Sequence, residues 1–211
     1  MAKNNAVVHD FAERLEWSAS LSDEAAWIEF YRKLWPDMIA CVRIDANCKW
    51  QRVGVDREII LPGLKHIYID EKKRDSEYTD VLLEEWSVSG FDWNSRQVIK
   101  PQKIGWALDG DKQCDYVAYA IPKNGLYYLL PFEILRATCV SNLPIWKRNT
   151  RWYPKPAKND TYVTINIAVP WPELQRCMVN EMRRAYTSSL SLPVPEFVGN
   201  QLLFPWNDNT T

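Results

Sequence analysis

The clearest pattern of apolar and polar positions lies in residues 52–72, where two alternating segments flank a Pro-Gly pair. Val55 and Ile59 share one side of the first segment, whereas Asp56 points to the other side, because successive side chains of a strand alternate. The Pro-Gly pair favours a turn, since proline presets φ and glycine accepts positive φ. This pattern predicts a β-hairpin with one apolar face and one charged face.

The register of this hairpin follows from matching its two apolar sets. Directly paired residues of an antiparallel hairpin lie on the same face. A loop over 62–64 satisfies this condition and pairs Leu61 with Lys65, whereas a two-residue loop does not. The same register sets Asp56 directly across from Asp70, with Cβ atoms about 4.5–5.5 Å apart.

The pairing of Asp56 with Asp70 predicts a metal site. Carboxylates at that distance repel, and each raises the pKa of the other unless a cation lies between them. Mg²⁺ is a hard cation that prefers oxygen ligands and fits this position. Lys72 lies on the same face, where it would position or deprotonate a water or neutralise charge on a phosphate. The charged face therefore has the parts of a hydrolytic site.

Asp56, Asp70 and Lys72 resemble the D…(D/E)xK signature of the PD-(D/E)XK, or restriction-endonuclease-like, nucleases. The first acid follows Gly-Val rather than proline, which departs from the signature. The likeness extends over roughly residues 23–175 to a group of phage and mobile-element proteins assigned to that superfamily. The sequence segments that resemble those proteins are WQRVGVDREIIL, IDEKKR, DVLLEEWS, GWALD, CDYVAYAI and YYLLPF.

This resemblance implies an α/β protein with a three-layer α/β/α core, a mixed β-sheet and a nuclease activity that needs Mg²⁺ or Mn²⁺. Asp56, Asp70 and the backbone carbonyl of Glu71 would hold the metal, and Lys72 would complete the catalytic set. The expected substrate is DNA, and the expected source is a phage or another mobile element. Restriction-like enzymes often act as dimers to cut both strands, so a homodimer stays open.

Two other interpretations stay open beside the nuclease. The segment IDEKKR also fits a solvated strand end with mixed charges, and the triplet alone favours that interpretation. A catalytically inactive nuclease-fold protein that binds nucleic acid or a host protein is the second, because a fold does not fix an activity.

Two groups of basic residues are candidate nucleic-acid contacts. The first group flanks the site and consists of Arg57, Lys73 and Arg74; arginine in particular matches phosphate geometry. The second lies in the segment IWKRNTRWYPKPAK and consists of Lys147, Arg148 and Arg151, interleaved with Trp146 and Trp152. No apolar periodicity includes these tryptophans, so stacking on bases is one role for them. An ordinary solvated loop is the other interpretation.

Helical spacing of Trp27, Phe30, Tyr31 and Leu34 predicts a helix over Asp23–Leu34 that begins after Ser22 and stops at Trp35-Pro36. Glu24 in its first turn is the candidate for an additional acid near the site. A favourable interaction with the helix dipole is the simpler explanation for that glutamate.

The remaining patterns predict alternating strands and helices. Strands are expected over 38–44, 115–121, 126–130 and 161–169, and helices over 80–86, from 131 onward and over 173–186. Residues 90–103 are expected to form a loop. The resemblance implies that Glu84 or Glu85, on the helix over 80–86, hydrogen-bonds Lys72 or a metal-bound water.

Composition limits the class of protein. A chain of 211 residues predicts one domain over 21–187, with an extension over 1–20 and an extended tail over 188–211. Its net charge is −1, so any nucleic-acid contact must be local. Five scattered cysteines without a C-x-x-C pair argue against zinc. Their odd number, without a signal peptide, predicts reduced thiols and a cytoplasmic location. No apolar run approaches the ~18–20 residues that cross a bilayer, so no membrane association is expected.

Overall fold

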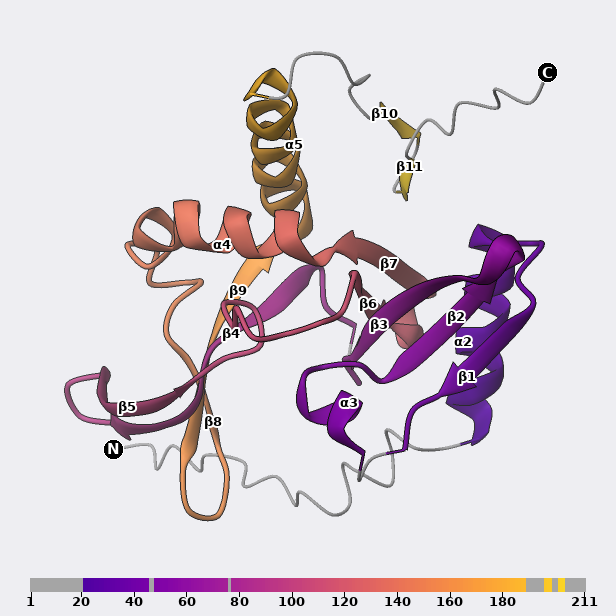
Figure 1. Cartoon of the computed structure of the whole chain (residues 1–211). Coiled ribbons are helices and arrows are strands. Elements are labelled where there is room, and N and C mark those ends of the chain that lie inside the picture. The colour runs from indigo at the N-terminus through magenta and orange to yellow at the C-terminus, as the bar shows by residue number, and fades with distance from the viewer. Residues whose placement is uncertain (1–20, 46–47, 76, 189–195, 199–200, 204–211) are drawn as a thin grey trace.

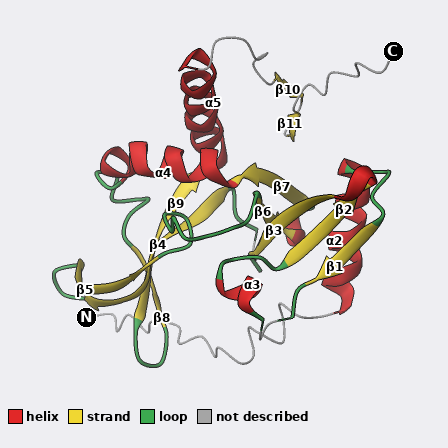
Figure 2. Cartoon of the chain, in the orientation of Figure 1, coloured by secondary structure: helices red, strands yellow, loops and turns green. Residues whose placement is uncertain are grey.

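The computed structural model describes residues 21–45, 48–75, 77–188, 196–198 and 201–203 (Figure 1). The prediction of an extension over 1–20 and most of the predicted tail over 188–211 lie outside these residues. The described chain is a mixed α/β fold with one mixed sheet, a second, antiparallel sheet, and helices packed against them (Figure 2). Of the described helices, none is long and apolar enough to cross a lipid bilayer.

The first sheet has five strands in the order β1-β2-β3-β6-β7. Strands β3 and β6 are parallel, and the other neighbours are antiparallel, so this sheet is mixed. Its strands are β1 Ala40–Arg43, β2 Arg57–Leu61, β3 Lys65–Lys73, β6 Tyr116–Ile121 and β7 Leu126–Pro131. The predicted strands over 38–44, 115–121 and 126–130 are thereby confirmed within a few residues at each end.

The hairpin β2–β3 has the predicted register. Leu61 pairs with Lys65, and the connection is a 3₁₀ turn, η1, over Pro62–Leu64. Gly63 within this turn has φ 74°, a conformation that glycine adopts without strain. One step beyond the ladder the backbone N–H of Asp56 donates to the carbonyl of Ile69 at 2.8 Å. The register therefore brings Asp56 opposite Asp70.

Helix α2, Leu21–Leu34, covers one face of the five-stranded sheet (Figure 1). Trp27 and Tyr31 are buried on Ile59 and Ile69 of the hairpin, in one apolar cluster. The predicted helix is confirmed, although it begins at Leu21 rather than after Ser22. The segment between β1 and β2 contains a short helix, α3, over Lys49–Arg52.

The second sheet has four strands in the order β5-β4-β9-β8. They are β4 Asp80–Asp92, β5 Gln97–Ile104, β8 Lys155–Lys158 and β9 Val163–Pro170. The predicted helix over 80–86 and the predicted loop over 90–103 are both wrong, because these residues form the antiparallel pair β4–β5. Strand β4 pairs with β9 along its other edge, and such pairing overrides local helix propensity.

The largest apolar cluster lies between the second face of the mixed sheet and the elements β4, β9, α4 and α5. Helix α4 spans Phe132–Trp146 and α5 spans Trp171–Ser188. The predicted helices from 131 and over 173–186 are confirmed, as is the strand over 161–169. Two further strands, β10 Glu196–Val198 and β11 Gln201–Leu203, pair with each other near the end of the chain.

Candidate active site

The hairpin β2–β3 carries a separate group of charged residues on each of its faces. Asp70 and Lys72 lie on one face, and Asp56, the residue before β2, lies opposite Asp70. Glu71 has the opposite parity and lies on the face covered by α2, together with Arg57. The three predicted catalytic residues, Asp56, Asp70 and Lys72, all belong to the first group.

Asp70 is the centre of the first group, and its side chain is only 1% exposed. Its Oδ1 accepts from Lys72 Nζ, and its Oδ2 accepts from Lys112 Nζ. Burial by itself would raise the pKa of Asp70, but the charges of the two lysines lower it below the usual value. Asp70 is therefore an ionised carboxylate held between two ammonium groups.

Asp56 differs from Asp70 in the direction in which its pKa is shifted. Its Oδ2 accepts the backbone N–H of Glu71 at 2.8 Å. Burial, and after it the neighbouring charge of Asp70, raise the pKa of Asp56 to about 6, against the opposing effect of Lys72. The carboxyl pair expected from the hairpin register is thus present, and it is incompletely compensated by positive charge.

Lys72 lies beside both carboxylates. Burial would lower the pKa of its ammonium, but attraction to Asp70 and Asp56 outweighs burial and raises that pKa above the usual value. Its Nζ also lies 3.4 Å from the carbonyl oxygen of Glu71 and 5.8 Å from the ring centre of Trp106. Lys72 is therefore protonated at neutral pH in this structure.

Lys112 is a member of this group that the sequence analysis missed. It comes from the segment between β5 and β6, 42 residues after Asp70, and nothing in the local pattern marks it. A contact with Asp70 from that distance in sequence is set by the packing of the intervening strands. The signature D…(D/E)xK contains a single lysine, so it gives no reason to expect a second.

Two glycines allow the segment that carries Lys112 to approach the hairpin and β4. A Cβ at Gly105 would overlap the carbonyl oxygen of Glu84 on β4. At Gly54, where φ is 78°, a Cβ would overlap Lys112 Nζ. The segment is also held at its end, where the backbone N–H of Gln113 donates to the carbonyl of Val53 at 2.9 Å.

Glu84 and Glu85 are consecutive residues of a strand and therefore point to opposite faces. Glu84 Oε1 accepts the backbone N–H of Trp106 at 3.3 Å, and its charge adds to the raised pKa of Lys72. Glu85 is buried and accepts from Lys147 Nζ. The charge of Glu84 thus acts on Lys72 from a strand rather than from the expected helix. The predicted hydrogen bond of Glu84 or Glu85 to Lys72 or to a metal-bound water stays a prediction.

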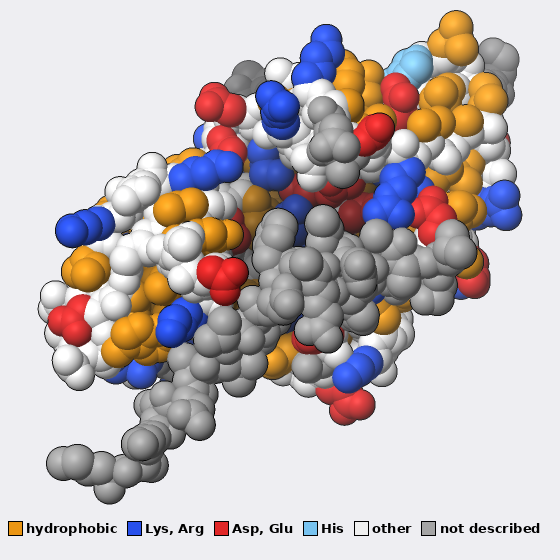
Figure 3. Space-filling view, turned by 90° about the horizontal axis from the view of Figure 1, so that it is seen from below, with side chains coloured by type: hydrophobic (Ala, Val, Ile, Leu, Met, Phe, Trp, Pro, Cys, Tyr) orange, Lys and Arg blue, Asp and Glu red, His pale blue; other side chains and the backbone are white. Residues whose placement is uncertain are grey.

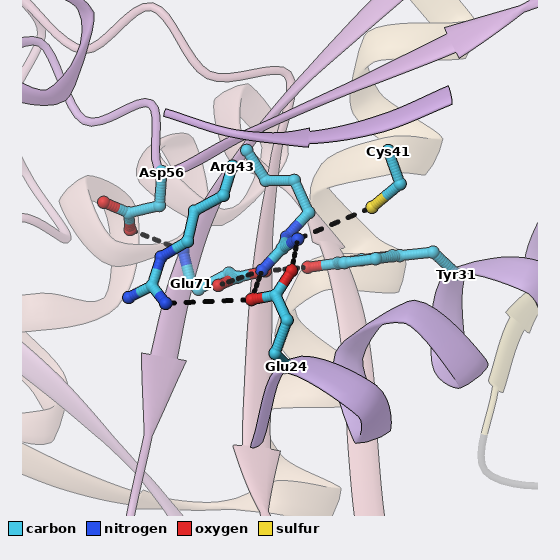
Figure 4. A network of polar contacts seen from close by, with 7 residues as sticks. Glu24, Tyr31, Cys41, Arg43, Asp56 and Glu71 are labelled. Carbon is cyan, nitrogen blue, oxygen red and sulfur yellow. Dashed lines mark hydrogen bonds and ion pairs between the residues drawn. The ribbon is translucent and has the colours of Figure 1, made fainter. Parts of the chain in front are cut away.

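Figure 4 shows the second group of charges, which includes Glu24, Tyr31 and Glu71. Its centre is Arg57, whose side chain is 0% exposed. Its Nη1 and Nη2 donate to the two carboxylate oxygens of Glu24 at 2.6 and 2.8 Å. Its Nε donates to Glu71 Oε1 at 2.5 Å, and the Tyr31 hydroxyl donates to the same oxygen at 2.8 Å. Burial would lower the pKa of Arg57, but these partners outweigh it and raise it.

This network corrects two expectations. Arg57 does not contact phosphate, because its guanidinium is fully buried and occupied by two carboxylates. Glu24 is not an additional acid of the metal site, because it lies on the other face and its pKa is lowered by its hydrogen bonds to Arg57. The signal was present in the sequence: Arg57 has the same parity as Val55 and Ile59, which places it on the apolar face.

The other flanking basic residues are at the end of β3. Arg74 donates to Asp80 Oδ1 and stacks on Tyr78, with 3.4 Å between the guanidinium carbon and the ring centre. Its contacts are thus made within the chain. Lys73 is half-buried beside it.

In the basic segment that begins at the end of α4, the predicted base-stacking role is wrong for one of the two tryptophans. Trp146 is 1% exposed and belongs to the main core, so it does not stack on bases. Trp152 is partly buried against the same core. Arg148 and Arg151 are exposed and border an open surface hollow that Trp152 also lines. These two arginines remain candidate phosphate contacts.

The face viewed in Figure 3 presents a central concentration of acidic side chains with Lys and Arg side chains beside it. Within the described part of the chain, no group of three or more His, Cys, Asp or Glu side chains is arranged to hold a metal ion. The oxygen donors at the hairpin are the carboxylates of Asp56 and Asp70 and the carbonyl of Glu71. No family model, curated protein or solved structure matches this chain.

Proposed function

We propose that the protein is a metal-dependent nuclease of the PD-(D/E)XK type that hydrolyses phosphodiester bonds of DNA. One observation carries the proposal: Asp56 and Asp70 lie side by side on one face of the hairpin, with Lys72 Nζ bonded to Asp70. A carboxylate pair with an adjacent ammonium has the parts needed to hold a divalent cation and to stabilise charge on a phosphate.

The arrangement of the sheet supports the proposal. The strand that carries Asp70 and Lys72 lies inside a mixed sheet and is parallel to β6. Helix α2 packs on one face of this sheet, and α4 and α5 belong to the core on the other face. This arrangement supports the three-layer core that the resemblance to restriction-endonuclease-like proteins leads us to expect.

The donor atoms fit Mg²⁺ or Mn²⁺. Magnesium in proteins is commonly bound by one or two carboxylates and keeps several waters, so Asp56, Asp70 and the Glu71 carbonyl would be sufficient. Each carboxylate offers about four lone-pair sites, and the pairing of Asp70 with two lysines leaves some of them for a metal. A cation between the carboxylates would also relieve the repulsion that helps raise the pKa of Asp56.

The residues of the chain would then have separate roles in the reaction. A bound divalent cation supplies polarisation of the phosphate and a water of lowered pKa. Lys72 carries a positive charge at neutral pH, so its ammonium would orient the attacking water or stabilise the charge that develops on the phosphate. The backbone N–H of Glu71 holds Asp56 in place.

The test is cleavage of single-stranded, double-stranded and branched DNA in Mg²⁺, Mn²⁺ or EDTA by the wild type, Asp56→Asn and Lys72→Met. Asparagine keeps an oxygen that accepts the Glu71 N–H but removes the charge. We expect metal-dependent cleavage by the wild type and its loss in both variants. Glu29→Gln is the matched control, because Glu29 is exposed on α2 and pairs only with Lys33 among the ion pairs described.

One observation favours a second candidate, a catalytically inactive nuclease-fold protein that binds nucleic acid or a host protein. The ammonium groups of Lys72 and Lys112 together compensate the charge of Asp70, so Asp70 does not need a metal ion for that purpose. This candidate predicts a folded wild type with no cleavage in any metal and no stabilisation by Mg²⁺ or Mn²⁺. The same experiment therefore separates the two.

A further inference from the structure

We propose that Lys112 is a second substrate-contacting lysine, whose ammonium binds a non-bridging oxygen of the scissile phosphate when a divalent cation occupies the two aspartates. The inference rests on the proposed function. It adds a residue from outside the hairpin to the three that the sequence signature marks, and it names an anionic phosphodiester as the group that this residue recognises.

The first argument is charge balance. In the structure two ammonium groups face two carboxylates, Asp56 and Asp70. A divalent cation on the two carboxylates would cancel both of their negative charges. Glu84 would then be the remaining acidic neighbour of Lys72, and Lys112 would lose the only ion pair described for it. A phosphodiester carries one negative charge in its ground state and about two in a pentavalent transition state. Two ammonium groups balance the two negative charges of the transition state, whereas Lys72 alone would balance one of them.

The second argument is that Lys112 is enclosed beside the hairpin. Its side chain lies directly against Gly54. It is only 9% exposed, and the next residue, Gln113, is bonded to Val53, three residues before Asp56. A lysine needed only for solubility would be exposed, and most of its entropy would be kept.

The third argument is position. Lys72 and Lys112 approach different oxygens of the same carboxylate, Oδ1 and Oδ2 of Asp70. Both ammonium groups are therefore in contact with the carboxylate that would hold the cation, and both would be close to a phosphate bound by that cation. Lys112 transfers no proton in this role; it supplies a fixed positive charge to the phosphate.

The experiment measures DNA binding as well as cleavage. Affinity of the intact protein for a fluorescent DNA duplex is determined by anisotropy in Ca²⁺ at several salt concentrations, with a gel to show that the DNA stays uncut. Cleavage rates are measured separately in Mg²⁺. The variants are Lys112→Met, Lys112→Arg and, as matched control, Lys33→Met, an exposed lysine on α2 behind the sheet.

We expect Lys112→Met to weaken binding about tenfold and to reduce the slope of log affinity against log salt by about one. Cleavage should fall by about 10²-fold or more, while the slope for Lys112→Arg returns toward that of the wild type because the charge is restored. Lys33→Met should leave binding and rate unchanged. If Lys112→Met does not fold, Lys112→Gln, which still offers Asp70 a hydrogen bond, replaces it.

Three results would overturn the inference. A wild type that cleaves DNA while Lys112→Met keeps the wild-type slope and rate removes Lys112 from the substrate site and leaves the proposed function standing. Faster cleavage by Lys112→Met would show instead that Lys112 competes with the metal for Asp70. A folded wild type that neither binds nor cuts DNA in any metal overturns the proposed function and this inference together.

Discussion

Glu71 and Asp56 are joined by a hydrogen bond from the backbone N–H of Glu71 to Asp56 Oδ2, 2.8 Å long. The side chain of Glu71 points to the opposite face of the sheet, where it accepts from Arg57 and Tyr31. One residue thus connects the candidate metal site to the buried network under α2. Arg57 and Tyr31 therefore fix the backbone that orients Asp56. Substitutions on one face of the sheet should alter the positions of the charged side chains on the other face.

Replacement of Arg57 by methionine should strongly destabilise the fold. The substitution leaves Glu24 and Glu71 facing each other without the guanidinium that joins them, and removal of one partner of a buried ion pair costs about 3–5 kcal/mol. Urea unfolding at pH 7 measures the free-energy change, with Arg32→Met on the exposed side of α2 as control. A loss equal to that of the control would contradict a structural role for Arg57.

Asp56→Asn should make the metal-free protein more stable at neutral pH. The pKa of Asp56 is raised from 3.8 to about 6 in the folded state, so the folded state holds this proton more tightly than the unfolded state. Ionisation therefore lowers stability as pH rises from about 4 through about 6, by on the order of 2–3 kcal/mol.

The corresponding measurement is urea unfolding in EDTA at pH 4 and at pH 7.5. We expect Asp56→Asn to exceed the wild type in stability at pH 7.5 and to match it near pH 4, where Asp56 is protonated when folded. A less stable Asp56→Asn at pH 7.5 would show that the negative charge is compensated in the metal-free protein.

Binding of Mn²⁺ should weaken as pH falls below about 6. Metal binding requires an ionised ligand, and the pKa of Asp56 lies at about 6. Titration calorimetry at pH 5 and 7.5 should give tighter binding at the higher pH, with proton release on binding near pH 6. Asp56→Asn should bind the ion weakly at both pH values. Equal affinity of the wild type at both pH values would exclude Asp56 as a ligand.

Two glycines in the segment that carries Lys112 should respond very differently to alanine. Gly105→Ala places a Cβ onto the Glu84 carbonyl, whereas at Gly110 the nearest heavy atom, Nη1 of Arg136, would be 3.5 Å from the new Cβ. Gly105→Ala should cost about 1–3 kcal/mol of stability and reduce cleavage, because the segment is displaced. Gly110→Ala should change both by little. Chemical unfolding and cleavage rates of the two variants make the comparison, and equal effects would contradict the close approach at Gly105.

The basic residues after α4 should separate into two kinds. Arg148 and Arg151 are exposed, so Arg148→Ala combined with Arg151→Ala should lower the salt slope of DNA binding by about two and leave stability nearly unchanged. Lys147→Ala should instead destabilise the protein, since it leaves buried Glu85 without its ammonium partner. Anisotropy and thermal unfolding distinguish these outcomes; an unchanged slope in the double variant would exclude this segment as a DNA contact.

Local alternation was sufficient to predict the hairpin β2–β3, its register and the opposition of Asp56 and Asp70, because these depend on parity and turn length within about twenty residues. The same parity, applied to Arg57 and Glu71, also indicates that they lie on the face beneath α2. The helix expected over 80–86 was wrong for the opposite reason: the apolar residues of VLLEEW fit either period, and pairing with β9 selected the strand.

Side-chain periodicity was sufficient to specify α2, β2, β3, β9 and α5, and through the hairpin the two adjacent aspartates. Strands β6 and β7 followed from β-rich apolar runs on either side of a turn. Which distant residues meet depends on tertiary packing: Lys112 at Asp70, Glu84 near Lys72, and Glu24 at Arg57. Those contacts join segments that are many residues apart, and they depend on how the two sheets and α2 pack. Periodicity reports the direction of a side chain within its own strand or helix, whereas packing determines what that side chain contacts.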